Sequence, residues 1–143
     1  LDVGSGGGSP AIPLKLVSPA TQLRMVEGKA RKSAFLREVI RQLSLDEAYV
    51  ETARLEELAS RPGLFALVDV VSLRGVRADL KMLAIVQQFV RPAGQVFFFS
   101  TVGTAAKLTL PPQLQFVDEV PLLAPLQSAL IRLQKRESSA WAG

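Results

Sequence analysis

The chain opens with a glycine-rich stretch, Leu1-Asp2-Val3-Gly4-Ser5-Gly6-Gly7-Gly8-Ser9-Pro10-Ala11, and an apolar, helix-like segment follows at Ile12 to Val17. The residues before the first glycine are typical of a strand end, and they carry an acid, Asp2. A glycine-rich turn between a strand and a helix lets the backbone approach a ligand closely, because no Cβ is in the way. The same composition is typical of a flexible linker, but the flanking strand and helix favour a ligand-binding loop.

The spacing of the glycines distinguishes between classes of nucleotide ligand. A dinucleotide site has the pattern G-x-G-x-x-G and would require a glycine at the position of Ser9. The glycines present are instead Gly4, Gly6 and Gly8. A phosphate-binding P-loop would continue with Gly-Lys-Ser/Thr, which this stretch lacks. A nicotinamide or flavin cofactor is therefore the weaker interpretation of the loop.

A second acid supports a nucleoside ligand. Glu27 follows the apolar, strand-like run Leu23 to Val26. It stands 19 residues beyond Gly8, where doubly wound nucleotide folds place a carboxylate on the ribose hydroxyls. A carboxylate can accept two hydroxyl hydrogen bonds at once, which suits a vicinal diol. We predict that Glu27 binds a ribose; the alternative is a solvated acid at a strand end.

Strand-like and helix-like segments alternate along most of the chain, which predicts an α/β fold with a parallel sheet covered by helices. From Pro111 onward two extended segments follow each other without a crossover helix, so we expect an antiparallel pair at the edge of the sheet. The predicted strands are Leu23 to Val26, Ala48 to Thr52, Leu67 to Ser72, Gln95 to Phe99, Gln113 to Val120 and Ser128 to Gln134.

Two amphipathic helices are predicted between these strands. The segment Arg31 to Leu43 carries apolar residues at helical spacing, which we expect to be buried. Asp79 is suited to cap a second helix, Leu80 to Val90, and Arg91-Pro92-Ala93-Gly94 should end that helix in a turn. The apolar residues of the first helix are Phe35, Leu36, Val39, Ile40 and Leu43.

The composition excludes several kinds of site. The chain contains no cysteine and no histidine, so disulfides, thiolate nucleophiles, Cys/His zinc sites and histidine-based triads are ruled out. We predict no metal, and no membrane partner because no apolar run reaches the roughly 18 residues that span a bilayer. The net charge of +4 favours polyanions such as nucleic acid, although an ordinary basic protein has the same balance. We expect one domain over residues 1–136 and a flexible tail over residues 137–143.

Four segments together resemble the ribosomal RNA small subunit methyltransferase G family, also called glucose-inhibited division protein B. Its members are class I methyltransferases that depend on S-adenosyl-L-methionine. The resemblance implies a Rossmann-like sheet, here with a truncated first strand, in a cytoplasmic enzyme that methylates guanine N7 in 16S rRNA or the small ribosomal subunit. The four segments are Asp2 to Leu14, Glu27 to Leu36, Ala53-Arg54-Leu55-Glu56-Glu57 and Asp69-Val70-Val71-Ser72-Leu73-Arg74-Gly75.

The resemblance also implies roles for individual residues. Leu55 and Glu56 would border the adenine, and Arg74 would reach into the cofactor pocket. Arg31 and Lys32 are candidates for phosphate contacts with RNA. For the charged residues, the alternative is a solvated side chain at a helix start or strand end. The expected ligands of S-adenosyl-L-methionine are Asp2, Gly4, Gly6, Gly8, Ser9, Glu27, Leu55, Glu56 and Arg74.

The chain departs from the family pattern at several positions. A Lys-Gly pair expected at the end of the fifth strand is replaced within Phe99-Ser100-Thr101, and an arginine expected before the last strand corresponds to Ser128. We also expect the family's N-terminal helical region to be absent here. These departures leave a second hypothesis, in which the chain is a non-catalytic relative that keeps the cofactor fold and acts as a binding module.

Overall fold

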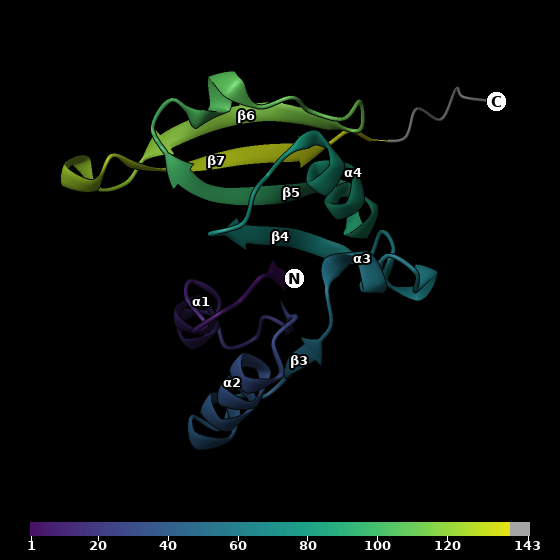
Figure 1. Ribbon diagram of the computed structural model, residues 1–143, viewed down its shortest axis with the longest axis vertical. Coiled ribbons are helices and arrows are strands. Elements are labelled where there is room, and N and C mark those ends of the chain that lie inside the picture. Colours follow the sequence, from purple (N-terminus) through teal and green to yellow (C-terminus); the bar gives the residue numbers. More distant parts are fainter. Residues whose placement is uncertain (138–143) are drawn as a thin grey trace.

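The computed structural model describes residues 1–137, which form one seven-stranded sheet in the order β3-β2-β1-β4-β5-β7-β6 (Figure 1). The first five strands in this order run parallel, and β7 is antiparallel to both of its neighbours. The predicted α/β sheet with an antiparallel C-terminal pair is confirmed. Apart from Glu137, the expected tail lies outside the described residues. The strands are β1 Asp2–Val3, β2 Leu23–Glu27, β3 Ala48–Thr52, β4 Val68–Arg74, β5 Val90–Thr101, β6 Leu114–Pro121 and β7 Ser128–Lys135.

The helices connect the parallel strands, and short 3₁₀ turns occupy three loops. The predicted cap of α4 is confirmed, because Asp79 Oδ1 accepts a hydrogen bond from the backbone N–H of Met82 at 2.8 Å. Within residues 1–137, no helix is long and apolar enough to cross a membrane. The helices are α1 Ala11–Val17, α2 Ala30–Gln42, α3 Leu55–Leu58 and α4 Leu80–Phe89, with the 3₁₀ turns η1 Pro62–Leu64, η2 Thr104–Lys107 and η3 Ala124–Leu126.

The two faces of the sheet pack against different helices. Successive side chains of a strand point to opposite faces, so Met25 joins a cluster with α1 and α2, whereas Val26 joins a cluster with α3 and α4. The second cluster is the larger one and extends to β7 through Ile131 and Leu133. In Figure 1, α1 and α2 lie to one side of β4, and α3 and α4 lie to the other. Helices therefore cover both faces of the parallel part of the sheet.

The helix predicted over Arg31 to Leu43 forms as α2, but two of its expected core residues are exposed. Leu36 is fully buried, whereas Phe35 is 54% exposed and Leu43, just beyond the helix end, is 47% exposed. On the opposite flank from Phe35, Arg37 donates to the backbone oxygen of Val50 in β3. Because α2 packs with one narrow face on β2 and β3, the flank that carries Phe35 has no partner among residues 1–137 that buries it.

The turn predicted after α4 is instead an irregular part of β5. Val90, expected in the helix, already belongs to the strand and pairs with Val68, and the next pair in the register is Val70 with Gln95. The residues Arg91 to Gly94 are accommodated as a bulge, in which Ala93 has a φ of +65°. The apolar side chain of Val90 is fully buried in the sheet core, which favours strand pairing over another turn of helix.

Candidate functional site

The candidate site lies where β1, β2, β3 and β4 end next to one another. Val3 pairs with Val26 on one side and with Leu73 on the other, so the loops that follow these strands meet at one edge of the sheet. Open α/β sheets bind ligands at this edge. The glycine loop, residues 4–10, follows the central strand β1 directly and therefore stands in the middle of the site.

The conformation of the glycine loop explains the predicted glycine pattern. Gly4, Gly6 and Gly8 have φ values of +70°, +53° and +90°, a region that other residues rarely adopt. A Cβ on Gly4 would lie 2.7 Å from Val76 Cγ1, and one on Gly8 would lie 2.9 Å from Ile12 Cδ1. Gly7, in contrast, has open space around its Cα. The backbone therefore needs glycine at the three predicted positions and presents an open face at Gly7.

The side chain of Glu27 links the glycine loop to the end of β2 through hydrogen bonds. Its carboxylate is 7% exposed and accepts hydrogen bonds from the backbone N–H groups of Gly6 (2.9 Å) and Lys29 (3.1 Å). Each carboxylate oxygen keeps a further acceptor position. The predicted acid thus lies beside the loop, with acceptor capacity for the hydroxyl groups of a ligand.

Asp2 is a buried acid beneath the loop. Ser72 in β4 donates to its Oδ1 at 2.6 Å, and Oδ2 has no hydrogen-bond partner among the described residues. Burial raises the pKa of the Asp2 carboxyl above its ordinary value. The Ser5 hydroxyl donates to the backbone oxygen of Asp2 at 3.1 Å and ties the loop back to the strand. Asp2 Oδ2 is thus a buried acceptor whose hydrogen bond is not made by any of residues 1–137.

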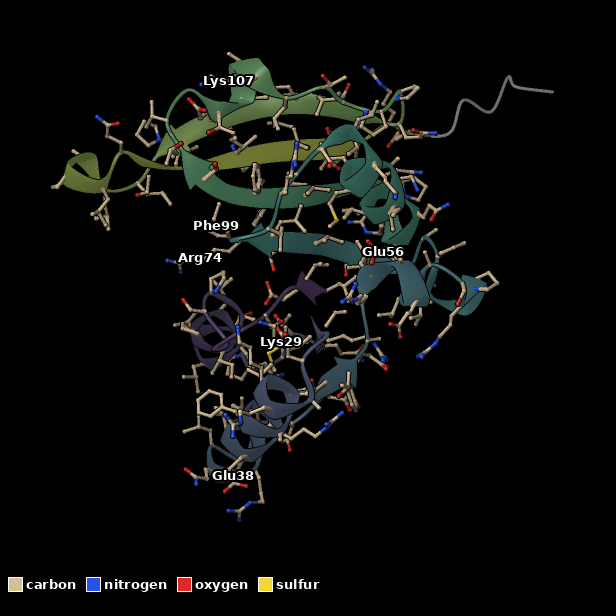
Figure 2. The ribbon with its side chains drawn as sticks, viewed as in Figure 1. Lys29, Glu38, Glu56, Arg74, Phe99 and Lys107 are labelled. Carbon is tan, nitrogen blue, oxygen red and sulfur yellow. The ribbon has the colours of Figure 1, made fainter. Side chains whose placement is uncertain are left out.

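Arg74 bridges the end of β4 to the glycine loop. Its Nη1 donates to Ser9 Oγ at 3.0 Å. Figure 2 shows Arg74 close to Phe99 at the open edge of the sheet, in agreement with the pairing of these two residues between β4 and β5. Two residues predicted for the cofactor site, Arg74 and Ser9, are therefore brought together across the mouth of the site.

The predicted adenine residues lie at the start of α3. Leu55 is 4% exposed and belongs to the main hydrophobic core, whereas Glu56 is exposed. Ala53, just before them, donates its backbone N–H to the backbone carbonyl oxygen of Glu27 at 3.1 Å and holds this segment against the end of β2. Only the backbone of Leu55 and the side chain of Glu56 can therefore face a ligand here.

The predicted RNA residues, Arg31 and Lys32, occupy the first turn of α2. Both side chains are exposed, and neither forms an ion pair or a side-chain hydrogen bond with any of residues 1–137. Lys29, the residue before the helix, also has a free ammonium group within that part of the chain. These cations are open to solvent beside the glycine loop.

Sequence reasoning missed two hydroxyl residues of the site, Ser5 and Ser72. Ser72 is 8% exposed, and its partner Asp2 is 70 positions away in the sequence. In the sequence, Ser72 stands out as a polar residue within the apolar run that forms β4. Its partner Asp2 could not be identified there, because the contact depends on the pairing of β1 with β4. The described residues contain no group of three or more Asp and Glu side chains that could hold a metal ion.

A separate cavity of about 490 Å³ lies at the other end of the parallel strands. Leu23, Val68 and Val70 line it together with side chains of α1. None of the residues predicted for the cofactor site lines this cavity, although Ser72, the hydrogen-bond partner of Asp2, does.

Comparisons with known proteins place the chain among rRNA methyltransferases. The family model of rRNA small subunit methyltransferase G matches residues 1–118. The ribosomal RNA small subunit methyltransferase G of Roseiflexus sp. (strain RS-1) is 42% identical over 84 residues, which are 59% of this chain and 36% of that protein. The protein of the same name from Xanthomonas axonopodis pv. citri (strain 306) is 32% identical over 125 residues, 87% of this chain and 57% of that protein.

Solved structures agree in fold. A putative methyltransferase, yhhF, from Escherichia coli has a TM-score of 0.74 at 16% identity, over 96% of this chain and 76% of that one. A mutant of MtNAS in complex with S-adenosylmethionine has a TM-score of 0.71 at 17% identity, over 94% and 53%. These likenesses show the Rossmann-like fold. The chain spans between about a third and just over half of the length of the curated relatives named above. By the match over residues 1–118, the chain belongs to the rRNA small subunit methyltransferase G family.

Proposed function

We propose that this chain binds S-adenosyl-L-methionine and serves as the catalytic domain of a cytoplasmic methyltransferase that acts on guanine N7 of 16S rRNA, free or in the small ribosomal subunit. The observation that carries the proposal is the glycine loop, held by the Glu27 carboxylate through the Gly6 N–H at 2.9 Å. The family membership and the cofactor in the MtNAS structure support the same cofactor class.

The residues at the carboxyl ends of the strands fit this cofactor. Gly4 and Gly8 stand where a Cβ would collide with Val76 or Ile12, so the loop can adopt this conformation against the protein only with glycine there, whereas the space beside Gly7 is open. Glu27 has acceptor capacity for the ribose hydroxyls, and Asp2 Oδ2 has no donor among residues 1–137. In the loop, the backbone N–H groups of Gly7 and Ser9 have no partner among residues 1–137, and the acids supply carboxylate oxygens, a combination suited to a nucleoside joined to an amino acid.

In the proposed site the remaining ligands would act at the two ends of the cofactor. Glu56 would border the adenine, and Ser9 and Arg74 would close the side of the pocket next to β4, where they are bonded to each other. When bound, S-adenosyl-L-methionine supplies an electrophilic methyl group on a sulfonium. Arg74, at the end of β4, would then help to orient the cofactor or the target base without transferring a proton.

For methyl transfer to guanine N7, the main contribution expected of the protein is to position the two reactants. Guanine N7 has a free lone pair at neutral pH, so the reaction needs no general base, and the chain has neither histidine nor cysteine to supply one. Alignment of two reactants at contact distance can itself provide most of the acceleration. The deep major groove of A-form RNA hides N7, so the target should be an unpaired or distorted guanine. Arg31 and Lys32 would contact phosphates of the same RNA.

Two of the departures from the family pattern, Ser100 and Ser128, lie at the ends of β5 and β7, whereas two others, Ser9 and Ala11, replace an apolar residue and a glycine in and just after the glycine loop. The Ser100 hydroxyl donates to Thr104, and Ser128 accepts from the backbone N–H of Leu123, so both serines stabilise loops that follow or precede the outer strands. The family match does not favour the hypothesis of a non-catalytic binding module. An activity test decides between the two, because a binding module would bind the cofactor without transferring a methyl group.

Calorimetric titration tests the cofactor first. We expect micromolar binding of S-adenosyl-L-methionine and no heat of binding from NAD. Transfer of a radiolabelled methyl group to 16S rRNA or small ribosomal subunits then tests the activity. Binding without transfer would support the non-catalytic alternative for this chain, and binding of neither compound would refute the proposed cofactor site.

A further inference from the structure

The start of α2 presents an exposed aromatic ring between two cations. Phe35 is 54% exposed. It follows Arg31 by four positions and Lys32 by three, so both side chains are its neighbours on the helix surface. Leu36, the residue next to Phe35, lies 3.2 Å from the position of a Cβ on Gly8. The buried face of α2 therefore packs against the proposed cofactor loop, and the exposed group lies on the outer flank of the same helix.

The cations in this group are free, whereas those at the other end of α2 are not. Within residues 1–137, the side chains of Lys29, Arg31 and Lys32 form no ion pair or hydrogen bond. Near the end of the helix, Arg41 is paired with Glu38. In Figure 2, Lys29 and Glu38 mark these two ends of the helix. The free charge is concentrated at the end beside the glycine loop.

This arrangement does not stabilise the helix. The N-terminus of a helix carries a partial positive charge that favours acids, yet the first turn of α2 has no acidic residue and two cations. An exposed phenylalanine likewise gains little from burial in the isolated domain. A ligand with negative charge and flat apolar faces would satisfy both features.

We propose that Arg31, Lys32 and Phe35 form a platform for a single-stranded segment of RNA, in which the Phe35 ring stacks on one base and the two cations contact flanking phosphates. Stacking on an aromatic side chain requires an unpaired base, whose faces are accessible, and it tolerates any base because every base has a π-face. The proposal rests on the proposed function, since it describes how RNA is held beside the target guanine.

Binding of a fluorescein-labelled, single-stranded 12-nucleotide RNA to the whole chain tests the platform by anisotropy. We expect Phe35→Ala to weaken binding at least fivefold, because stacking contributes about 1–3 kcal/mol per base, and Phe35→Tyr to retain it. Leu43→Ala is the matched control, since Leu43 is 47% exposed at the opposite end of the same helix. A duplex of the same sequence should be insensitive to Phe35→Ala.

The salt dependence of binding tests the two cations. The affinity falls as salt rises, so log K plotted against log salt has a negative slope. In the double variant Arg31→Gln/Lys32→Gln this slope should become less steep by about 1.4, which corresponds to the loss of two phosphate contacts on a single strand. Lys107→Gln removes an equally exposed charge from η2, which Figure 2 shows far from Lys29. An unchanged affinity in Phe35→Ala, or an equal loss per charge in Lys107→Gln, would overturn the platform.

The outcome is separable from that of the proposed function. If Phe35→Ala binds RNA as the original chain does while S-adenosyl-L-methionine still binds and methyl transfer proceeds, the platform is wrong and the enzyme assignment stands. If RNA binding depends on Phe35 but S-adenosyl-L-methionine does not bind, the proposed function fails and the platform stands. Circular dichroism on each variant shows whether the fold is intact.

Discussion

Polar groups are used differently in the glycine-loop region and in the antiparallel pair β6–β7. In β6 and β7 they bond to one another or to nearby backbone: Arg132 pairs with Asp118, and Glu119 accepts from the N–H groups of Gly103 and Ala105. Around the glycine loop, Glu27 and Asp2 are buried and hold the loop while they keep acceptor capacity. The charged groups of the antiparallel pair are partly exposed, whereas the two acids beside the glycine loop are buried, and one oxygen of Asp2 has no partner among residues 1–137.

Polar groups in these two regions should affect different properties of the protein, namely its stability and its binding of a ligand. Partly exposed ion pairs such as Arg132–Asp118 contribute little to stability, because water screens the attraction between the charges. Buried acids with spare acceptor positions cost stability, and they are retained where a ligand completes their hydrogen bonds. Changes in the glycine loop should therefore affect cofactor binding, and changes in the edge pair should not.

The largest effect is expected for Gly8→Ala. Its φ of +90° is unfavourable for alanine, and the new Cβ would lie 2.9 Å from Ile12 Cδ1. We expect a loss of about 1–3 kcal/mol in the free energy of unfolding and at least tenfold weaker binding of S-adenosyl-L-methionine. Urea denaturation and calorimetry measure the two effects. Gly7→Ala is the control in the same loop, since a Cβ there meets nothing within 4 Å; an equal effect of both changes would contradict the geometric explanation.

Glu27→Gln should have the next largest effect. A carboxamide of the same shape can accept from only one of the two N–H groups that Glu27 now binds, those of Gly6 and Lys29. We expect a loss of about 1–3 kcal/mol in stability, the cost of an unsatisfied buried group, together with weaker cofactor binding. Glu57→Gln, an exposed acid at the start of α3, should change neither quantity. Normal cofactor affinity in Glu27→Gln would rule out the ribose contact.

The pH dependence of stability tests Asp2. Burial raises its pKa in the folded chain, so the folded state binds the proton more strongly than the unfolded state does. The stability that this proton contributes is complete in acid and is lost as the pH rises through the raised pKa. Asp2→Asn cannot ionise, so its stability relative to the original chain should increase from pH 4 to pH 7 in urea denaturation. A difference that stays constant with pH would show that Asp2 titrates normally.

Asp118→Asn should have the smallest effect. Arg132 holds the pKa of the Asp118 carboxyl below its ordinary value, so the stabilisation by this pair is present at neutral pH and is lost as the pH falls through that lowered pKa. Because both side chains are partly exposed, we expect only a slight decrease in Tm at neutral pH and unchanged binding of S-adenosyl-L-methionine. A clear change in cofactor affinity would break the distinction between the two regions.

Most of the fold could be predicted because its signals are local. Strand boundaries followed runs of apolar residues, and β3 was predicted to the residue, Ala48–Thr52. The bulge at Arg91 to Gly94 was missed because the same residues that favour a turn can also form a bulge, and the choice depends on pairing with β4. Phe35 was expected to be buried and is exposed for a similar reason. Helical spacing identifies the apolar face of a helix, but the contact area with the neighbouring sheet decides how much of that face is buried.

The sequence by itself determined the positions that need glycine and the acid that follows them, because backbone conformation and loop spacing are properties of a short segment. Only the tertiary structure decided which groups meet at the site. The hydrogen bonds from Ser72 to Asp2 and from Arg74 to Ser9 join residues 70 and 65 positions apart. Such contacts depend on β4 lying beside β1, and that order arises from the packing of helices on both faces of the whole sheet.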